Sequence, residues 1–145
     1  MRLHRSASNH LAEAAVLGVT AGLRSMTPLA ALALRGRVPG PPALKWVLLA
    51  AAAGELVGDK LPMTPARTSP PALGGRLASG AIAGALVAGP AGAAVGALAA
   101  GLGAYAGQYG RAALSGKTGW PDPVIAIGED KLALGLAYVG TRGLD

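Results

Sequence analysis

The longest stretch of this chain without a charged side chain runs from Leu77 to Gly110. A single straight helix of that length would be about 50 Å long, which exceeds the roughly 30 Å hydrocarbon core of a bilayer. The sequence Gly89-Pro90-Ala91-Gly92 lies inside the stretch and is typical of a turn. We therefore expect two apolar helices here, over about 75–88 and 91–114, joined by that turn.

The composition favours a membrane protein. Of the 145 residues, 52% are hydrophobic and 14% are charged, whereas a soluble domain carries about a quarter charged residues. The mean hydropathy is +0.44. Alanine and glycine bury little area in a soluble core but let membrane helices approach closely. The alternative is a soluble, alanine-rich bundle. The net charge of +6 is scattered through loops, which favours contact with lipid headgroups over binding of nucleic acid.

We expect an all-α integral membrane bundle of about five short helices, forming one transmembrane domain over residues 11–145 after a polar, basic segment over 1–10. The helices are expected at 11–34, 43–57, 75–88, 91–114 and 123–141. The first apolar run continues into Arg24 without a clean cleavage site, so it is interpreted as a retained helix and not a signal peptide. Pro28 disfavours helix in the residue before it, which predicts a kink or break within this first crossing.

Glycines four residues apart, such as Gly18 and Gly22, recur along the chain and predict tight helix–helix faces. Small-residue surfaces of this kind also favour a homodimer in the lipid bilayer. The runs GELVGDKL at 54–61 and GEDKL at 128–132 are similar, as are residues 20–24 and 105–111. They are interpreted as an inverted repeat, as in several transporters, with chance similarity as the alternative.

The distribution of lysine and arginine over the loops of five crossings favours a cytoplasmic N-terminus. The expected location is the inner (cytoplasmic) membrane of a bacterium.

Four runs of the sequence resemble a known family: GLRSMTPLA at 22–30, GDKLPMTPART at 58–68, GGR at 74–76 and DPVIAIGED at 122–130. They are similar to the signature runs of a family of small membrane proteins catalogued as domain of unknown function four-one-two-six. The resemblance covers about residues 11–137. It implies an integral membrane protein and implies no particular activity.

Charged residues within or beside the apolar segments are the candidate site, because an unpaired charge in a membrane is costly. Arg24 has the hydroxyl donors Ser25 and Thr27 beside it. Glu55 and Asp59 share a helix face, whereas Glu129 and Asp130 are adjacent, so only one of these two is expected to face the same cavity. The complete set of candidate ligands for a substrate or ion is Arg24, Ser25, Thr27, Glu55, Asp59, Lys60, Arg67, Thr68, Arg111, Glu129 and Asp130.

We expect Arg24 to lie within salt-bridge reach of at least one acidic residue of this set, and Lys60 and Arg67 to lie at a water-facing mouth. Thr64, Arg67, Thr68 and Ser69 form a candidate anion cradle, with a surface loop that touches lipid phosphates as the alternative. Asp122 is predicted to cap the last helix.

These residues predict a small transporter or channel that moves an ion or small solute, anions included, through a polar cavity. The alternative is a non-transporting membrane protein that binds lipid headgroups or a protein partner, with its charges holding the bundle together. The chain has no cysteine and no recognisable catalytic triad or metal-hydrolase motif, so we expect neither an enzyme nor a cofactor. Metal binding is left open.

Overall fold

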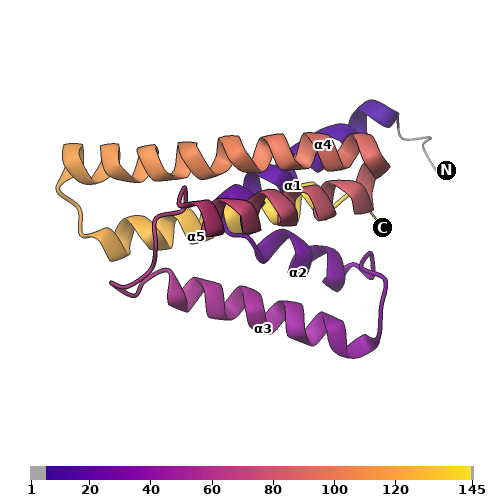
Figure 1. The fold of residues 1–145 in the computed structure, drawn as a ribbon, viewed down its shortest axis with the longest axis horizontal. Helices are drawn as coiled ribbons and strands as arrows, with labels where there is room; N and C mark the ends of the chain where they lie inside the picture. The colour runs from indigo at the N-terminus through magenta and orange to yellow at the C-terminus, as the bar shows by residue number, and fades with distance from the viewer. Residues whose placement is uncertain (1–5, 145) are drawn as a thin grey trace.

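The computed structural model describes residues 6–144, and this range is helical with no strand. The helices are α1 (Ala7–Leu23), α2 (Thr27–Leu34), α3 (Pro42–Gly58), α4 (Pro70–Thr118) and α5 (Asp122–Thr141) (Figure 1). The predicted all-α class is confirmed. Of the predicted N-terminal segment over 1–10, residues 1–5 lie outside the described range, and residues 7–10 form the first turn of α1.

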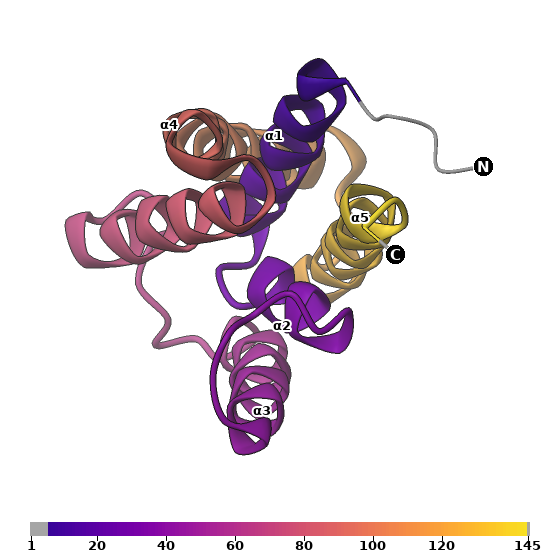
Figure 2. The same cartoon turned by 90° about the vertical axis from the view of Figure 1, so that its right-hand side faces the viewer.

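Helix α4 consists of two arms that fold back on each other. Ala88 and Gly89 have non-helical backbone angles, and the φ of +62° at Gly89 is one that glycine adopts without strain. The arms pack backbone against backbone, because a Cβ atom on Gly84 would lie 2.0 Å from the carbonyl oxygen of Gly92. Figure 1 and Figure 2 both show the two arms side by side. The turn predicted at 89–92 is confirmed.

Helix α1 packs against the second arm of α4 through the same kind of contact. A Cβ atom on Gly22 would lie 2.3 Å from the carbonyl oxygen of Ala100, and one on Gly103 would lie 2.6 Å from that of Val19. The helices approach this closely only where one partner lacks a side chain. The glycine-lined helix face predicted for the first segment is therefore confirmed.

The chain breaks after Leu23, as predicted, but it then reverses direction. Leu17 of α1 packs in the same core cluster as Leu29 and Leu32 of α2, although Leu17 and Leu32 would be about 22 Å apart in one continuous helix. The start of α1 and the loop between α2 and α3 consequently lie at the same end of the bundle (Figure 1). The prediction that this segment makes one kinked crossing is wrong, and the lysine and arginine count that placed the N-terminus in the cytoplasm does not apply to this topology.

Helix α3 lies at the edge of the bundle (Figures 1 and 2) and has no buried residue. It packs mainly against α2. The second half of the chain has no counterpart of the α1–α2 break, because the second arm of α4 and all of α5 are continuous. The structure does not confirm the inverted repeat.

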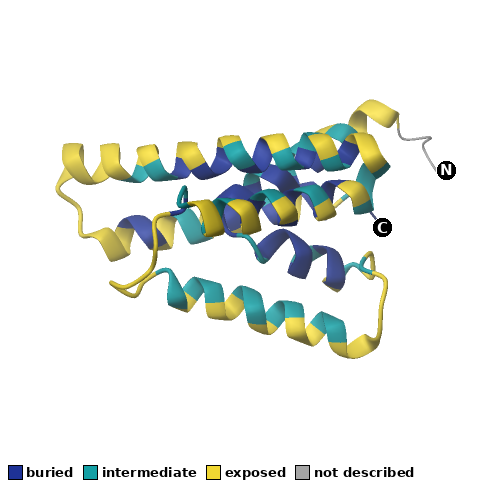
Figure 3. Ribbon diagram, viewed as in Figure 1, coloured by how far each residue is buried: buried dark blue, intermediate teal, exposed yellow. Residues whose placement is uncertain are grey.

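Apolar side chains dominate the outer surface, whereas several charged ones are inside. Leu98 is 72% exposed and Trp46 is 66% exposed, but Arg24 is 0% exposed, and Figure 3 shows how exposed positions cover the outer faces of α3 and α4. Among the helices that the structure describes, α4 is the one whose length and composition are sufficient to cross a membrane.

The close contact between the arms of α4 predicts a strong effect of Gly84→Ala. The added methyl group has no space, so the free energy of unfolding should fall by about 1–3 kcal/mol, the usual cost of overpacking. Denaturant unfolding of the protein in detergent measures this. Gly128→Ala is the control, because a Cβ atom there meets no atom within 4 Å and alanine favours a helix over glycine. Equal effects of the two substitutions would contradict the packing.

Candidate functional site

The break between α1 and α2 leaves backbone N–H groups without helical partners, and Glu55 of α3 accepts their hydrogen bonds. The backbone nitrogen of Ser25 donates to Oε1 of Glu55 at 2.7 Å, and that of Met26 donates to Oε2 at 2.8 Å. The Ser25 hydroxyl also donates to Oε1, at 2.9 Å. These bonds place a carboxylate at the N-terminal end of α2, where a helix favours negative charge.

Two carbonyl groups at the break accept hydrogen bonds from side chains of α4. Nη1 of Arg76 donates to the carbonyl oxygen of Gly22 at 2.9 Å, and the Ser79 hydroxyl donates to that of Ser25. Nη2 of Arg76 also lies 3.8 Å from Glu55. Sequence reasoning missed Arg76 and Ser79 as site residues. The available signal was that Arg76 is the last charged residue before the long uncharged stretch.

Arg24 lies at the centre of the site and bridges two helices. Its Nε atom donates to Oδ1 of Asp130 on α5 at 2.7 Å, and its Nη1 atom donates to Oδ2 of Asp59, the C-cap residue that follows α3. The prediction that Arg24 approaches an acidic residue is confirmed, with two carboxylates as partners. Burial of a guanidinium group requires such pairing.

Both acidic residues at 129–130 reach this centre, so the prediction that only one of them faces it is wrong. Asp130 accepts a hydrogen bond from Nζ of Lys60 at 2.7 Å. Glu129 accepts two from Arg67, at 2.8 and 2.6 Å. The two carboxylates point in different directions from α5. Both are nevertheless paired, because their cationic partners approach from different directions. Gly107 gives Arg67 its space, because a Cβ atom there would lie 2.8 Å from Nη1 of Arg67.

The outer end of the site is the pair Arg111 and Asp122. Nε and Nη2 of Arg111 donate to the two carboxylate oxygens of Asp122 at 2.8 and 2.6 Å. These hydrogen bonds lower the pKa of Asp122 below its ordinary value, so the pair persists to a lower pH than a free aspartate would allow. Asp122 is the first residue of α5 and its cap position is Pro121, so the predicted capping role of Asp122 is wrong.

The ion pairs join four cations and four carboxylates into one network, and Arg76 and Glu55 form a separate pair beside it. The network consists of Arg24, Lys60, Arg67, Arg111, Asp59, Asp122, Glu129 and Asp130. The predicted cluster differs in two details: Glu55 bonds the backbone at the break and not Arg24, and Arg111 lies at the outer edge. Thr27 is buried but lines a mainly apolar groove between α2, α3 and α5.

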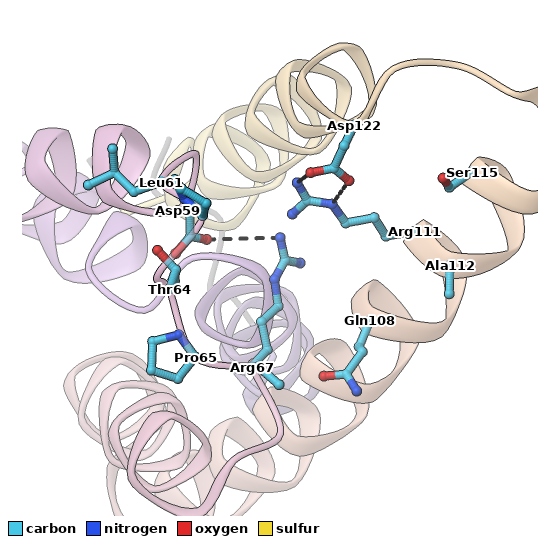
Figure 4. Close-up of a pocket in the computed structure, with 12 residues that line it drawn as sticks. Asp59, Leu61, Thr64, Pro65, Arg67, Gln108, Arg111, Ala112, Ser115 and Asp122 are labelled. Atoms are coloured by element: carbon cyan, nitrogen blue, oxygen red, sulfur yellow. Dashed lines mark hydrogen bonds and ion pairs between the residues drawn. The ribbon is translucent and has the colours of Figure 1, made fainter.

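A cavity of about 480 Å³ opens beside the outer part of the network (Figure 4). It lies at the end of the bundle where the α3–α4 loop meets the end of α4 and the start of α5. Its lining residues are Asp59, Leu61, Pro62, Thr64, Pro65, Ala66, Arg67, Gln108, Arg111, Ala112, Ser115 and Asp122.

Of the two residues predicted at a water-facing mouth, one is partly exposed and the other is buried. The side chain of Lys60 is 35% exposed, in agreement with the prediction, but that of Arg67 is buried. The predicted anion cradle is largely occupied by bonds within the protein: the Thr64 hydroxyl donates to the carbonyl oxygen of Gly58, and the Thr68 hydroxyl donates to Oε1 of Gln108 at 2.8 Å. Gln108 was missed as a site residue because it lies within the uncharged apolar stretch.

Within residues 6–144, no group of three or more histidine, cysteine or acidic side chains is arranged to hold a metal ion. No protein-family model, curated protein or solved structure matches the chain. The resemblance to the family of small membrane proteins therefore stays a prediction from its sequence motifs.

The bridging role of Arg24 predicts a large loss of stability for Arg24→Met. This change leaves two inward-facing carboxylates without their shared partner, and it should lower the free energy of unfolding by about 3–5 kcal/mol. Adding Asp59→Asn and Asp130→Asn should restore part of the loss, because the uncompensated charges disappear. Denaturant unfolding in detergent measures both effects. Arg142→Met, at an exposed position, is the control and should change little. A small effect of Arg24→Met would contradict the bridging role.

Proposed function

We propose that the protein is an integral membrane transporter or channel that moves an ion or small polar solute through the ion-pair network at the α1–α2 break. One observation carries this proposal: a broken helix and a charge-balanced network lie inside a bundle whose outer surface is apolar. Charged side chains inside membrane segments are expensive and mark solute or proton pathways.

The apolar surface supports the membrane assignment. Large exposed side chains occur along α3, both arms of α4 and α5, including Val47, Ile82, Leu98 and Leu134. A soluble monomer rarely exposes large contiguous apolar patches, whereas a bilayer favours them. The proposed location is a bacterial inner membrane, and the proposed assembly is a homodimer formed through such small-residue and apolar surfaces.

The arrangement at the break supports a transport role. In several transporters, discontinuous helices point their N-terminal ends at the bound solute near the middle of the bilayer. Here Glu55, beside the network, occupies the N-terminal end of α2. The ion pairs then continue from Arg24, which is 0% exposed, to Asp122, whose side chain is 65% exposed. They form a series of alternating charges beside the cavity, along which a solute exchanges partners.

The position of α3 at the edge of the bundle supports the proposal that this helix moves during transport. Helix α3 has no buried residue, and its C-terminal end is attached to the rest of the bundle by Glu55, Asp59 and Lys60. Exchange of these pairs for contacts with a solute would release α3 from the break. A gate of this kind opens the inner end of the network while the cavity serves its outer end.

A second candidate function is a non-transporting membrane protein that binds lipid headgroups or a protein partner. One observation favours it: every carboxylate of the network, and Glu55 beside it, has a cation within 4.0 Å, an arrangement that suits a purely structural role. The two functions differ in the effect expected when the ion pairs are replaced by apolar residues. If the ion pairs are purely structural, the protein keeps its function when well-packed apolar residues replace them. If they form a transport path, the replacement abolishes transport.

The transport proposal predicts solute entry into liposomes that contain the purified protein. Osmotic swelling and ion-sensitive dyes should report entry of at least one ion or small polar solute. Glu55→Gln should lower that rate at least about tenfold, because loss of the carboxylate weakens bonds each worth about 1.5–3 kcal/mol. Lys117→Gln, an exposed change outside the network, should leave the rate unchanged. Folded protein that admits none of the tested solutes would favour the second candidate.

A further inference from the structure

The cavity beside the network carries both signs of charge in equal number. Its lining includes the guanidinium groups of Arg67 and Arg111 and the carboxylates of Asp59 and Asp122 (Figure 4). The two signs alternate in space: Arg67 lies 3.9 Å from Asp59, and Arg111 is bonded to Asp122. A ligand that carries only one charge meets groups of its own sign at this surface, which disfavours its binding.

Asp59 and Arg111, which both line the cavity, each have one atom with unused bonding capacity. Oδ2 of Asp59 accepts from Arg24 and contacts Arg67, and within residues 6–144 no bond involves Oδ1. Nε and Nη2 of Arg111 donate to Asp122, whereas the contact of Nη1 within the same range is one of 3.5 Å with Glu129. The cavity therefore offers one carboxylate acceptor and one guanidinium donor to a ligand.

Gln108 adds a neutral donor with a fixed orientation. Its Oε1 atom accepts from the backbone nitrogen of Thr68 at 3.3 Å and from the Thr68 hydroxyl at 2.8 Å. Because a backbone N–H group can only donate, the amide oxygen must face Thr68, and the amide nitrogen is left to donate elsewhere. Gln108 and Arg111 both lie on the second arm of α4 and line the cavity together.

We propose that this cavity binds a small zwitterionic solute, and this inference rests on the transport function proposed above. The carboxylate of the solute binds Nη1 of Arg111 and the amide nitrogen of Gln108, and its ammonium group binds Oδ1 of Asp59. The volume of about 480 Å³ lies within the range of about 300–1,000 Å³ that is usual for small-molecule sites. A single inorganic ion would leave most of that volume to water.

Calorimetric titration of the full chain in detergent tests the charge preference. The zwitterions L-alanine and 4-aminobutyrate are compared with the anions L-lactate and butyrate and with the cations L-alaninamide and butylamine, which match them in size. At least one zwitterion should bind about tenfold or more tightly than both of its singly charged analogues. Absence of binding by both zwitterions, or equal or tighter binding of the singly charged analogues, would overturn the proposal.

Two substitutions at the outer edge of the cavity should change its charge preference in opposite directions, one towards cations and the other towards anions. Arg111→Gln removes the group that binds the solute carboxylate, so zwitterion binding should weaken about tenfold and approach that of the cation. Asp122→Asn frees Arg111, so binding of the anion should strengthen. Lys117→Gln, outside the cavity lining, should leave all affinities unchanged. If both edge substitutions weaken every probe equally, their role is structural and the proposal fails.

Uptake of radiolabelled L-alanine and 4-aminobutyrate into liposomes separates this inference from the transport proposal. Tight zwitterion binding in detergent, without uptake of the zwitterions or of any other tested solute, would support the site and overturn transport. Uptake of other solutes, without zwitterion binding, would support transport and overturn the site.

Discussion

Arg24 holds three helices together from the position where α1 ends. Its side chain is fully buried and bonds Asp59 at the end of α3 and Asp130 within α5. An enclosed guanidinium group is tolerated only when its attraction to carboxylates and its hydrogen bonds offset the loss of hydration. Arg24 therefore helps to fix the positions of α3 and α5 relative to the break.

The broken backbone next to Arg24 imposes a second requirement. A helix that stops inside an apolar bundle exposes N–H and C=O groups that water cannot reach, and each must find a partner within the protein. Glu55 accepts from the N–H groups, and Arg76 and Ser79 donate to the carbonyl groups. The same side chains that complete the backbone thus bring charge to the break, which is why the polar centre and the break occur together.

Local steric rules account for what could be predicted from the sequence. Proline and glycine restrict or free the backbone of adjacent residues, so the break before Pro28 and the turn at Gly89 were foreseeable. The pairing of Arg24 was also foreseeable, because an isolated buried charge is costly. The reversal of α2 was not, since it depends on the packing of Leu17 with Leu29 and Leu32, a tertiary contact that leaves no local pattern.

Long side chains account for the error at residues 129–130. Helical geometry correctly indicated that Glu129 and Asp130 diverge, but Arg67 and Lys60 reach them from two directions. The roles of Arg76 and Ser79 were missed because their partners are backbone carbonyl groups, which a sequence pattern of opposite charges does not reveal. The sequence therefore predicted the helices and several residues of the site, but not which of these residues contact one another.

We propose that α1 and α2 form a helix–break–helix unit that enters a membrane and returns to the same side. The chain has no cysteine, so single cysteines can be introduced at exposed positions and labelled in sealed membrane vesicles with a membrane-impermeant maleimide. We expect cysteines at Ser8, Pro39 and Ala91 to be labelled from one side of the membrane, and those at Met63 and Lys117 to be labelled from the other. Labelling at Ser8 and Pro39 from opposite sides, or labelling of all five positions from the same side, would contradict it.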